Sequence, residues 1–296
     1  MTTPVRSLVL VLGFAVLTGC LPDDTRKAPG RLDVTVTSDY ALSASTPGFD
    51  TADGWHVEYD RFLITLGEVA LGGDDCTPYN DTDYSRVLDA LLDAPQKLSA
   101  PVALGACDFR FRMRPPPDDA VLGVGVTAAD LKMLREPGSD GFAEDSGSAV
   151  YVSGKAQRAA DTKRFAWSFR LGAQFDDCKL LADSGVSLSS DDQQSVDITL
   201  RSAALFQSVP NDALAERRFA PFAEADDVHG NGDGSVTLEE LASVPLGANA
   251  TFDRWDSFAD YLYTGLVPKL PRFRGAGICS IGPIDEGGHG PGGGKH

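Results

Sequence analysis

The sequence predicts a mainly β protein, in which an antiparallel β-sandwich-like body is followed by a helical unit near the C-terminus. Apolar and polar residues alternate over several stretches, which is typical of strands with one buried and one solvated face. The regular succession of strands and long helices found in nucleotide-binding α/β folds is missing. The 296 residues are enough for one large domain, with or without a small appendix.

The N-terminal residues 1–19 are predicted to be a signal peptide. Arg6 precedes an apolar run at 8–16, which is too short to span a bilayer. The run ends in Leu-Thr-Gly-Cys at residues 17–20, which resembles the lipobox of bacterial lipoproteins. This resemblance implies that Cys20 carries acyl chains that insert into a lipid bilayer. The alternative is an ordinary secretory signal with an incidental cysteine.

The residue after Cys20 predicts the membrane in which the lipoprotein is anchored. Leu21 follows the cysteine, and bacterial lipoproteins without Asp at that position are usually sorted to the outer membrane. The resemblance therefore implies an outer-membrane, lipid-anchored protein, periplasmic or exposed at the cell surface. Residues 20–30 are polar and rich in Pro and Gly, as expected of a lipidated tether.

A β-rich domain is predicted over residues 31–208. The parity of the apolar side chains changes between 55–59 and 62–66, which predicts a bulge near Asp60 and Arg61. Other stretches with the alternation of a strand are 32–36, 107–114, 149–152, 165–175 and 196–200.

Two helices are predicted within this domain. Residues 83–92 place Val87, Leu88 and Leu91 at helical spacing before a proline. Residues 127–135 begin with Thr127 and have Asp130 three positions later, the pattern of a capping box.

The cysteines indicate disulfides. With Cys20 assigned to the lipid, four cysteines remain, and an even number in an exported chain predicts two bridges with three possible connectivities. Of these we favour Cys76 with Cys107 and Cys178 with Cys279. No Cys and His spacing in the sequence suggests a zinc site.

Oxygen-bearing residues recur at a particular spacing between 229 and 240. Gly234 is flanked by residues that correspond to positions 1, 3, 5, 7, 9 and 12 of a calcium loop. In this order they are His229, Asn231, Asp233, Ser235, Thr237 and Glu240.

This stretch resembles the EF-hand loop, and apolar residues at helical spacing flank it on both sides. The resemblance implies a Ca²⁺ cofactor held by the side chains of Asn231, Asp233 and Glu240, by the Ser235 carbonyl, and through a water by Thr237. His229 stands where the family has Asp, which weakens affinity for a hard cation. Asp226 and Asp227 lie just upstream and offer the missing charge. The alternative is a Gly-rich acidic turn that binds no ion.

The helical EF-hand-like unit is predicted to cover residues 209–284. A helix with an apolar stripe is expected from Thr251 to Leu266, ended by Pro268. Residues 285–296 are predicted to be a disordered Gly-rich tail.

The remaining features of the sequence argue against some classes of function. The net charge of −17 argues against nucleic acid as a partner. No GxSxG, HExxH, SxxK or P-loop pattern is present, so we expect no enzymatic activity. The histidines, at 56, 229, 289 and 296, are scattered.

The sequence therefore predicts a membrane-anchored lipoprotein with a calcium site, acting as a structural or binding module. The general layout is also similar to that of periplasmic copper-binding lipoproteins, so a copper or other transition-metal carrier is the alternative.

Overall fold

The computed structural model describes residues 28–40, 47–80, 82–136, 147–180, 185–209, 215–246 and 255–284. The predicted signal peptide, Cys20 with most of its tether, Thr251, and the C-terminal tail with His289 and His296 lie outside these residues.

The chain is mainly β, as predicted. Within the described ranges the strands join into one 16-stranded sheet, whose central order is β14-β10-β9-β3-β7-β1-β13-β15. The strands are β1 (Gly30–Ser38), β2 (Phe49–Asp50), β3 (His56–Gly72), β4 (Cys76–Pro78), β5 (Ser85–Asp89), β6 (Gln96–Ser99), β7 (Val102–Met113), β8 (Val121–Leu122), β9 (Val150–Arg158), β10 (Asp161–Phe169), β11 (Ala173–Lys179), β12 (Val186–Leu188), β13 (Gln193–Leu200), β14 (Ser235–Val236), β15 (Pro271–Phe273) and β16 (Ile278–Gly282).

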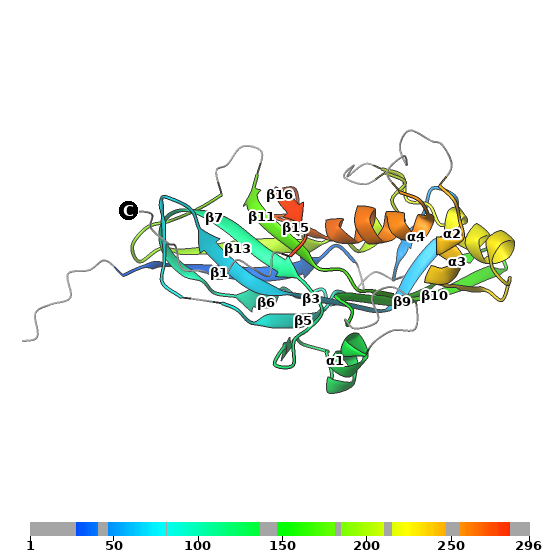
Figure 1. Ribbon diagram of the computed structural model, residues 1–296, viewed down its shortest axis with the longest axis horizontal. Helices are drawn as coiled ribbons and strands as arrows, with labels where there is room; N and C mark the ends of the chain where they lie inside the picture. The colour runs from blue at the N-terminus through cyan, green and yellow to red at the C-terminus, as the bar shows by residue number, and fades with distance from the viewer. Residues whose placement is uncertain are drawn as a thin grey trace, which may run out of the picture.

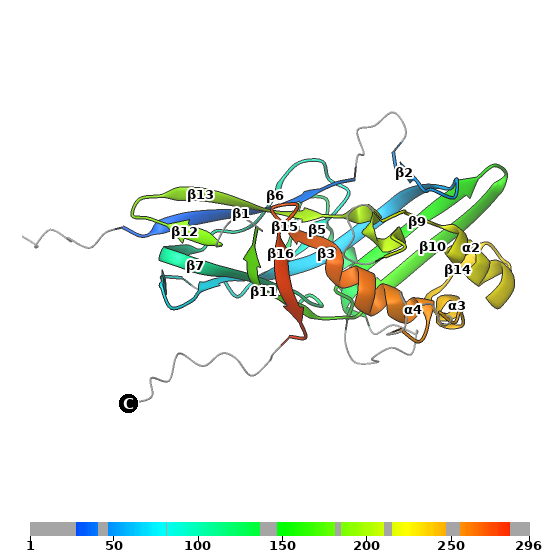
Figure 2. The same cartoon turned by 90° about the horizontal axis from the view of Figure 1, so that it is seen from above.

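The sheet is mixed and not purely antiparallel. Strands β3, β7, β9 and β10 pair antiparallel, but β1 and β13 run parallel along their whole length. The parallel pair was not predicted, because the alternation of apolar and polar residues shows that one face is buried and does not show the direction of the neighbouring strand. The sheet lies along the long axis of the molecule, with β1 starting near one end and the β9–β10 hairpin reaching the other (Figures 1 and 2).

Of two predictions about the course of the strands, one is confirmed and the other is wrong. The bulge near Asp60 and Arg61 is confirmed, since the register between β3 and β9 shifts between Tyr59 and Arg61. The continuous strand expected over 165–175 is wrong, because the chain leaves β10 after Phe169 and resumes in β11 at Ala173. β10 pairs with β9, whereas β11 pairs with β7 and β16.

The helix predicted at 83–92 is a strand, β5, which pairs antiparallel with β3. Leu88 belongs to the main hydrophobic core, whereas Val87 packs in a smaller cluster with Leu63 and Leu134. Both faces of β5 are therefore buried. Adjacent apolar residues in a strand buried on both faces match the helical spacing as well as they match a strand.

The helix predicted at 127–135 is confirmed as α1 (Ala128–Arg135). Thr127 accepts a hydrogen bond from the backbone N–H of Asp130, and the Asp130 carboxylate accepts one from the backbone N–H of Thr127. This reciprocal capping box satisfies two N–H groups at the start of the helix. α1 lies on the opposite side of the sheet from the other helices (Figure 1).

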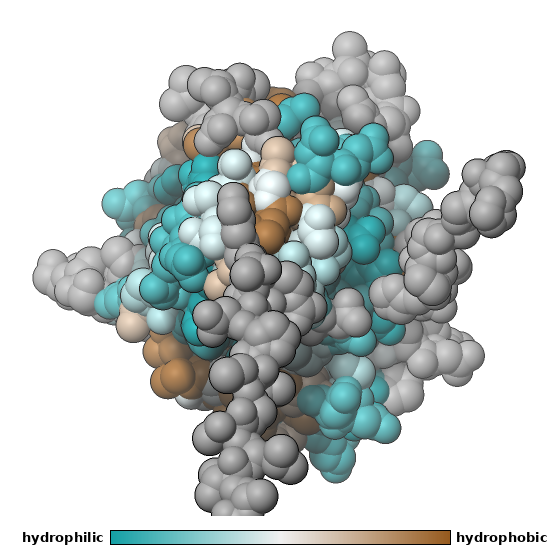
Figure 3. Space-filling model, turned by 90° about the vertical axis from the view of Figure 1, so that its left-hand side faces the viewer, coloured by the Kyte–Doolittle hydropathy of each residue, from teal (hydrophilic) through white to brown (hydrophobic). Residues whose placement is uncertain are grey.

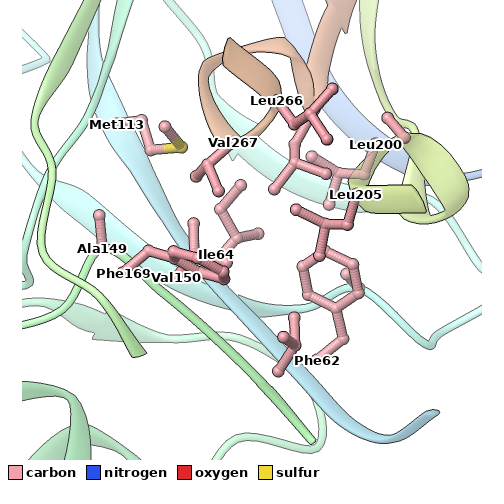
Figure 4. Packing of buried hydrophobic residues seen from close by; sticks show 14 of the residues in the cluster. Phe62, Ile64, Met113, Ala149, Val150, Phe169, Leu200, Leu205, Leu266 and Val267 are labelled. Atoms are coloured by element: carbon pink, nitrogen blue, oxygen red, sulfur yellow. The ribbon is translucent and has the colours of Figure 1, made fainter. Parts of the chain in front are cut away.

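The C-terminal third contributes the remaining helical segments. They are η1 (Ser202–Phe206), α2 (Ala220–Glu224), η2 (Ala225–His229), α3 (Leu238–Ala242), α4 (Phe258–Asp260), η3 (Tyr261–Leu266) and η4 (Val267–Lys269). The segments from α4 to η4 follow one another without a break and pack Leu266 and Val267 against the sheet (Figure 4). After them the chain returns to the sheet as β15 and β16. Within the described residues no helix has both the length and the apolar character needed to cross a membrane.

Both favoured disulfides are confirmed. Cys76 is bonded to Cys107, and Cys178 is bonded to Cys279. The first bridge fastens β4 to β7, and the second fastens β11 to β16 near the end of the described chain.

Candidate cation-binding loop

The candidate loop joins η2 to α3 and lies at the end of the molecule opposite the start of β1 (Figures 1 and 2). It is built onto the sheet through β14, which pairs with β10 in parallel register so that Val236 lies opposite Phe165. The Val236 side chain is buried, and its carbonyl accepts a hydrogen bond of 2.9 Å from Nε1 of Trp167. The middle of the loop is therefore fixed by the core.

Aromatic packing holds the incoming helix in place. Phe222 on α2 stacks on Trp167, with ring centroids 5.4 Å apart, and also contacts Phe258 at 4.7 Å. Phe219, immediately before α2, packs against Phe222 at 5.4 Å. These contacts fix the position of η2 and hence of the acidic residues that it carries.

The polar side chains of the first half of the loop bond to one another. The Asn231 side-chain oxygen accepts a hydrogen bond from the backbone N–H of Asp233 at 3.0 Å, and Asn231 Nδ2 donates to Asp233 Oδ2 at 3.0 Å. The other Asp233 oxygen accepts from the backbone N–H of Ser235 at 2.8 Å. The Asn231 amide and both Asp233 oxygens are therefore engaged in hydrogen bonds within the loop.

Glu240 closes the loop from its far end. One carboxylate oxygen accepts hydrogen bonds from the backbone N–H and hydroxyl of Thr237, and the other accepts from the backbone N–H of Asn231 at 3.2 Å. Thr237 in turn accepts from the N–H of Glu240, which completes a capping box at the start of α3. The Glu240 carboxylate is therefore bonded to two sides of the loop at once.

Asp226 is a carboxylate upstream of the loop that bonds to the loop backbone. It is fully buried, and its Oδ2 accepts a hydrogen bond of 3.0 Å from the backbone N–H of Gly234. Its carbonyl accepts another from the backbone N–H of Gly232, also at 3.0 Å. The second carboxylate oxygen, Oδ1, is buried and has no hydrogen-bond partner among the described residues. A buried carboxylate oxygen in this state favours a cation or an ordered water beside it.

A lysine from the sheet neutralises this acidic end. Lys163 Nζ lies 2.6 Å from Asp226 Oδ2 and 2.6 Å from Asp227 Oδ1, and its side chain is only 5% exposed. Burial lowers the pKa of Lys163, but the bonds to Asp226 and Asp227 outweigh it and the pKa is raised above its ordinary value. The ammonium is therefore charged at neutral pH and binds η2 to β10.

Lys163 was missed in the sequence, although a pattern identifies it. It has the same parity in β10 as Phe165, Trp167 and Phe169, which all point into the core. A lysine on the buried face of a strand needs a carboxylate partner. That requirement points to a nearby acidic pair, and Asp226 with Asp227 is the pair that the fold supplies.

The predicted ligands are only partly brought together. Asn231, Asp233, Ser235, Thr237 and Glu240 share the hydrogen-bonded loop. His229 is exposed at the end of η2, and no bond of its side chain to the loop is found in the described part of the chain. Nowhere in the described ranges do three or more His, Cys, Asp or Glu side chains gather closely enough to hold a metal ion.

The donor set nevertheless fits calcium in kind. The loop supplies carboxylate, amide, hydroxyl and backbone oxygens, which hard cations prefer, and the unpartnered Asp226 oxygen adds a buried negative group. The second described histidine, His56, has both ring nitrogens engaged, with Asp50 at 2.8 Å and the Pro47 carbonyl at 3.0 Å. Neither described histidine belongs to an imidazole cluster of the kind that copper prefers.

Comparison of the chain with protein-family models, with curated proteins and with solved structures finds no match.

Proposed function

We propose that the protein is a lipid-anchored, exported binding or structural module whose loop at 229–240 binds calcium. The observation that supports this proposal is the hydrogen-bonded loop that joins Asn231 to Asp233 and to Glu240, together with a buried carboxylate oxygen of Asp226 that lacks a hydrogen-bond partner among the described residues. The copper alternative gains no support from the environment of either described histidine.

Calcium would be held by Asn231, Asp233 and Glu240 through their side chains, by the Ser235 carbonyl and through Thr237. Both carboxylate oxygens of Glu240 already accept hydrogen bonds, from Thr237 and from the Asn231 backbone, and the ion competes with these donors for the same oxygens. Binding therefore exchanges existing hydrogen bonds for coordination, and no carboxylate stands at position 1. We expect weak affinity, with a Kd of about 10⁻⁴ to 10⁻³ M, as in extracellular modules.

Glu240→Gln is expected to abolish the stabilisation of the fold by calcium. In the wild type, calcium at about ten times its Kd should raise the free energy of unfolding by roughly 1.4 kcal/mol through mass action. The substitution removes the negative charge that the ion requires, and urea denaturation with and without calcium measures the difference. The matched control is Glu239→Gln, since Glu239 is the exposed neighbour on the same helix. An unchanged calcium shift in Glu240→Gln would exclude this loop as the site.

Calcium titration of two further variants decides which residue is the first ligand. His229→Asp should tighten calcium binding, because it restores a carboxylate at position 1. Asp227→Asn should have little effect, since the Asp227 side chain is half-exposed and already bonded to Lys163. If His229→Asp changed nothing and Asp227→Asn destroyed binding, the loop would begin upstream.

The first described residues and the loop lie at opposite ends of the molecule. The described chain starts close to the end where β1 begins, and α2 and α3 lie at the other (Figures 1 and 2). The end where β1 begins shows a mostly hydrophilic surface with small hydrophobic areas (Figure 3). Because Cys20 is eight positions before residue 28 in the sequence, we propose that this end faces the bilayer and that the calcium loop lies at the far end.

Cys20→Ala should release the protein from membranes. The prediction rests on the Leu-Thr-Gly-Cys sequence after an apolar run, since acyl chains contribute about 0.8 kcal/mol of membrane affinity per buried CH₂. Membrane fractionation of cells expressing each form measures the effect, and the wild type should be found with the membranes. An equal amount of Cys20→Ala protein in the membrane fraction would contradict the anchor.

A further inference from the structure

A small cavity is lined by residues of β11, β15 and β16 and by Lys269 at the end of η4. Its volume is about 170 Å³. No residue of the loop at 229–240 lines it. Two cationic side chains and several apolar ones form its wall, namely Lys269, Arg272, Phe175, Phe273, Ile278 and Ile281.

The cations of this region form no ion pair with an acidic residue in the described part of the chain. Among the described residues no ion pair joins Lys269, Arg272 or the adjacent Arg201 to a carboxylate. The Nε atom of Arg272 is buried and has no hydrogen-bond partner in the same part of the chain. Acidic residues outnumber basic ones in the chain as a whole, 43 to 26.

The fold forces these positive groups together. Arg272 lies opposite Thr199 in the β13–β15 pair, and the N–H of Arg201 donates to the Leu270 carbonyl at 2.8 Å. Burial, followed by the proximity of Arg272, lowers the pKa of Lys269. Burial, followed by the proximity of Arg201, lowers the pKa of Arg272. Like charges held close in a half-buried site are costly unless an anion neutralises them.

The lining defines the kind of anion. A guanidinium group with a free N–H binds an oxyanion in a fixed geometry, and an ammonium adds a point charge. The remaining wall is aromatic and aliphatic, which favours a ligand with an apolar part. The cavity volume of about 170 Å³ is close to that of an engineered apolar cavity of about 150 Å³ that holds one benzene molecule, so a single aromatic ring fits.

We propose that this cavity is a binding site for a small organic anion, a carboxylate attached to a short apolar group. The carboxylate lies between Lys269 and Arg272, and the apolar group packs against Phe175 and Phe273. The site is separate from the calcium loop, so the two do not depend on each other.

The test uses the detergent-solubilised full chain, with benzoate as the probe and benzamide as its neutral counterpart. We expect benzoate to bind in a calorimetric titration and to raise the melting temperature, and benzamide to do neither. Equal binding of the two compounds, or no binding of benzoate, would overturn the proposal. Inorganic phosphate supplies the oxyanion alone, and tighter binding of phosphate than of benzoate would remove the apolar part of the ligand from the proposal.

Variants locate the site. Lys269→Gln and Arg272→Gln should each weaken benzoate binding by roughly tenfold to a hundredfold, the loss expected for a charge-assisted hydrogen bond. Without ligand, Lys269→Gln should melt no lower than the wild type, because it relieves repulsion, so a loss of binding in this variant does not reflect unfolding. Lys132→Gln is the control, since Lys132 is 79% exposed on α1. Benzoate affinity that is unchanged in Lys269→Gln would place the site elsewhere.

Unchanged benzoate binding in Glu240→Gln would confirm that the cavity is independent of the calcium loop, and loss of benzoate binding in that variant would contradict this independence.

Discussion

Lys163→Met is expected to lower the free energy of unfolding by about 3–5 kcal/mol at neutral pH, which is the cost of breaking a buried ion pair by removing one partner. The substitution leaves the Asp226 carboxylate, which is 0% exposed, without its cation. Burial lowers the pKa of Lys163, and its bonds to Asp226 and Asp227 raise it by more, to above the ordinary 10.5. The contribution of the ammonium to the free energy of unfolding is therefore complete at neutral pH. It is lost only as the pH rises from the ordinary pKa of 10.5 through the folded-state pKa. Chemical denaturation of the two proteins measures the loss.

Two further variants separate the buried pair from its exposed neighbour. Asp227→Asn should cost less than about 1 kcal/mol, because that side chain is 51% exposed and solvent screens its charge. The double variant Lys163→Met with Asp226→Asn should recover most of the loss, because no unpaired buried charge remains. If the double variant were as unstable as the sum of the single ones, Lys163 and Asp226 would not act as a pair.

Loss of the Cys178–Cys279 bridge is expected to be the other large effect. The bridge joins residues 101 positions apart, so its removal by a pair of serine substitutions should cost about 4.7 kcal/mol on the chain-entropy account. The Cys76–Cys107 bridge spans 31 positions, and its removal should cost about 3.7 kcal/mol. Denaturation under oxidising conditions measures both losses. A larger loss from the shorter bridge would contradict loop closure as the main source of the stabilisation.

Local patterns predicted much of the sheet. The parity change on either side of Asp60 is visible in the sequence, since a bulge shifts every later side chain to the other face. The capping box of Thr127 and Asp130 is equally local. The disulfide pairing was one of three possibilities, and the connectivity that keeps each bridge between neighbouring cysteines along the chain proved correct.

Local patterns could not predict which strands that are distant in sequence become neighbours in the sheet. The segment 83–92, expected to be a helix, contains the strand β5. Val87 and Leu88 are buried on its two faces, so the sequence lacks the alternation of apolar and polar residues that marks a strand. The parallel pairing of β1 with β13 joins residues about 160 positions apart, and no local feature of either strand specifies it.

In the candidate loop, too, the local features were predicted from the sequence and the contact with a distant residue was not. The spacing from Asn231 to Glu240 identified residues that the fold does place in one hydrogen-bonded ring. The cation that faces its upstream end is Lys163, which is 63 positions away from Asp226. The pairing of β10 with β14 and the packing of α2 on Trp167 bring the two together. The contribution of Asp226 to the loop could therefore be suspected from the sequence, and its neutralisation by Lys163 could not.

Calorimetric titration of the detergent-solubilised full chain with calcium, and separately with copper, tests the proposed calcium loop most directly. We predict saturable binding of one calcium ion with a Kd of about 10⁻⁴ to 10⁻³ M, lost in Glu240→Gln and retained in Glu239→Gln. A wild-type protein that gives no calcium signal at ten times that concentration but takes up copper stoichiometrically would contradict the calcium loop and establish the transition-metal carrier in its place.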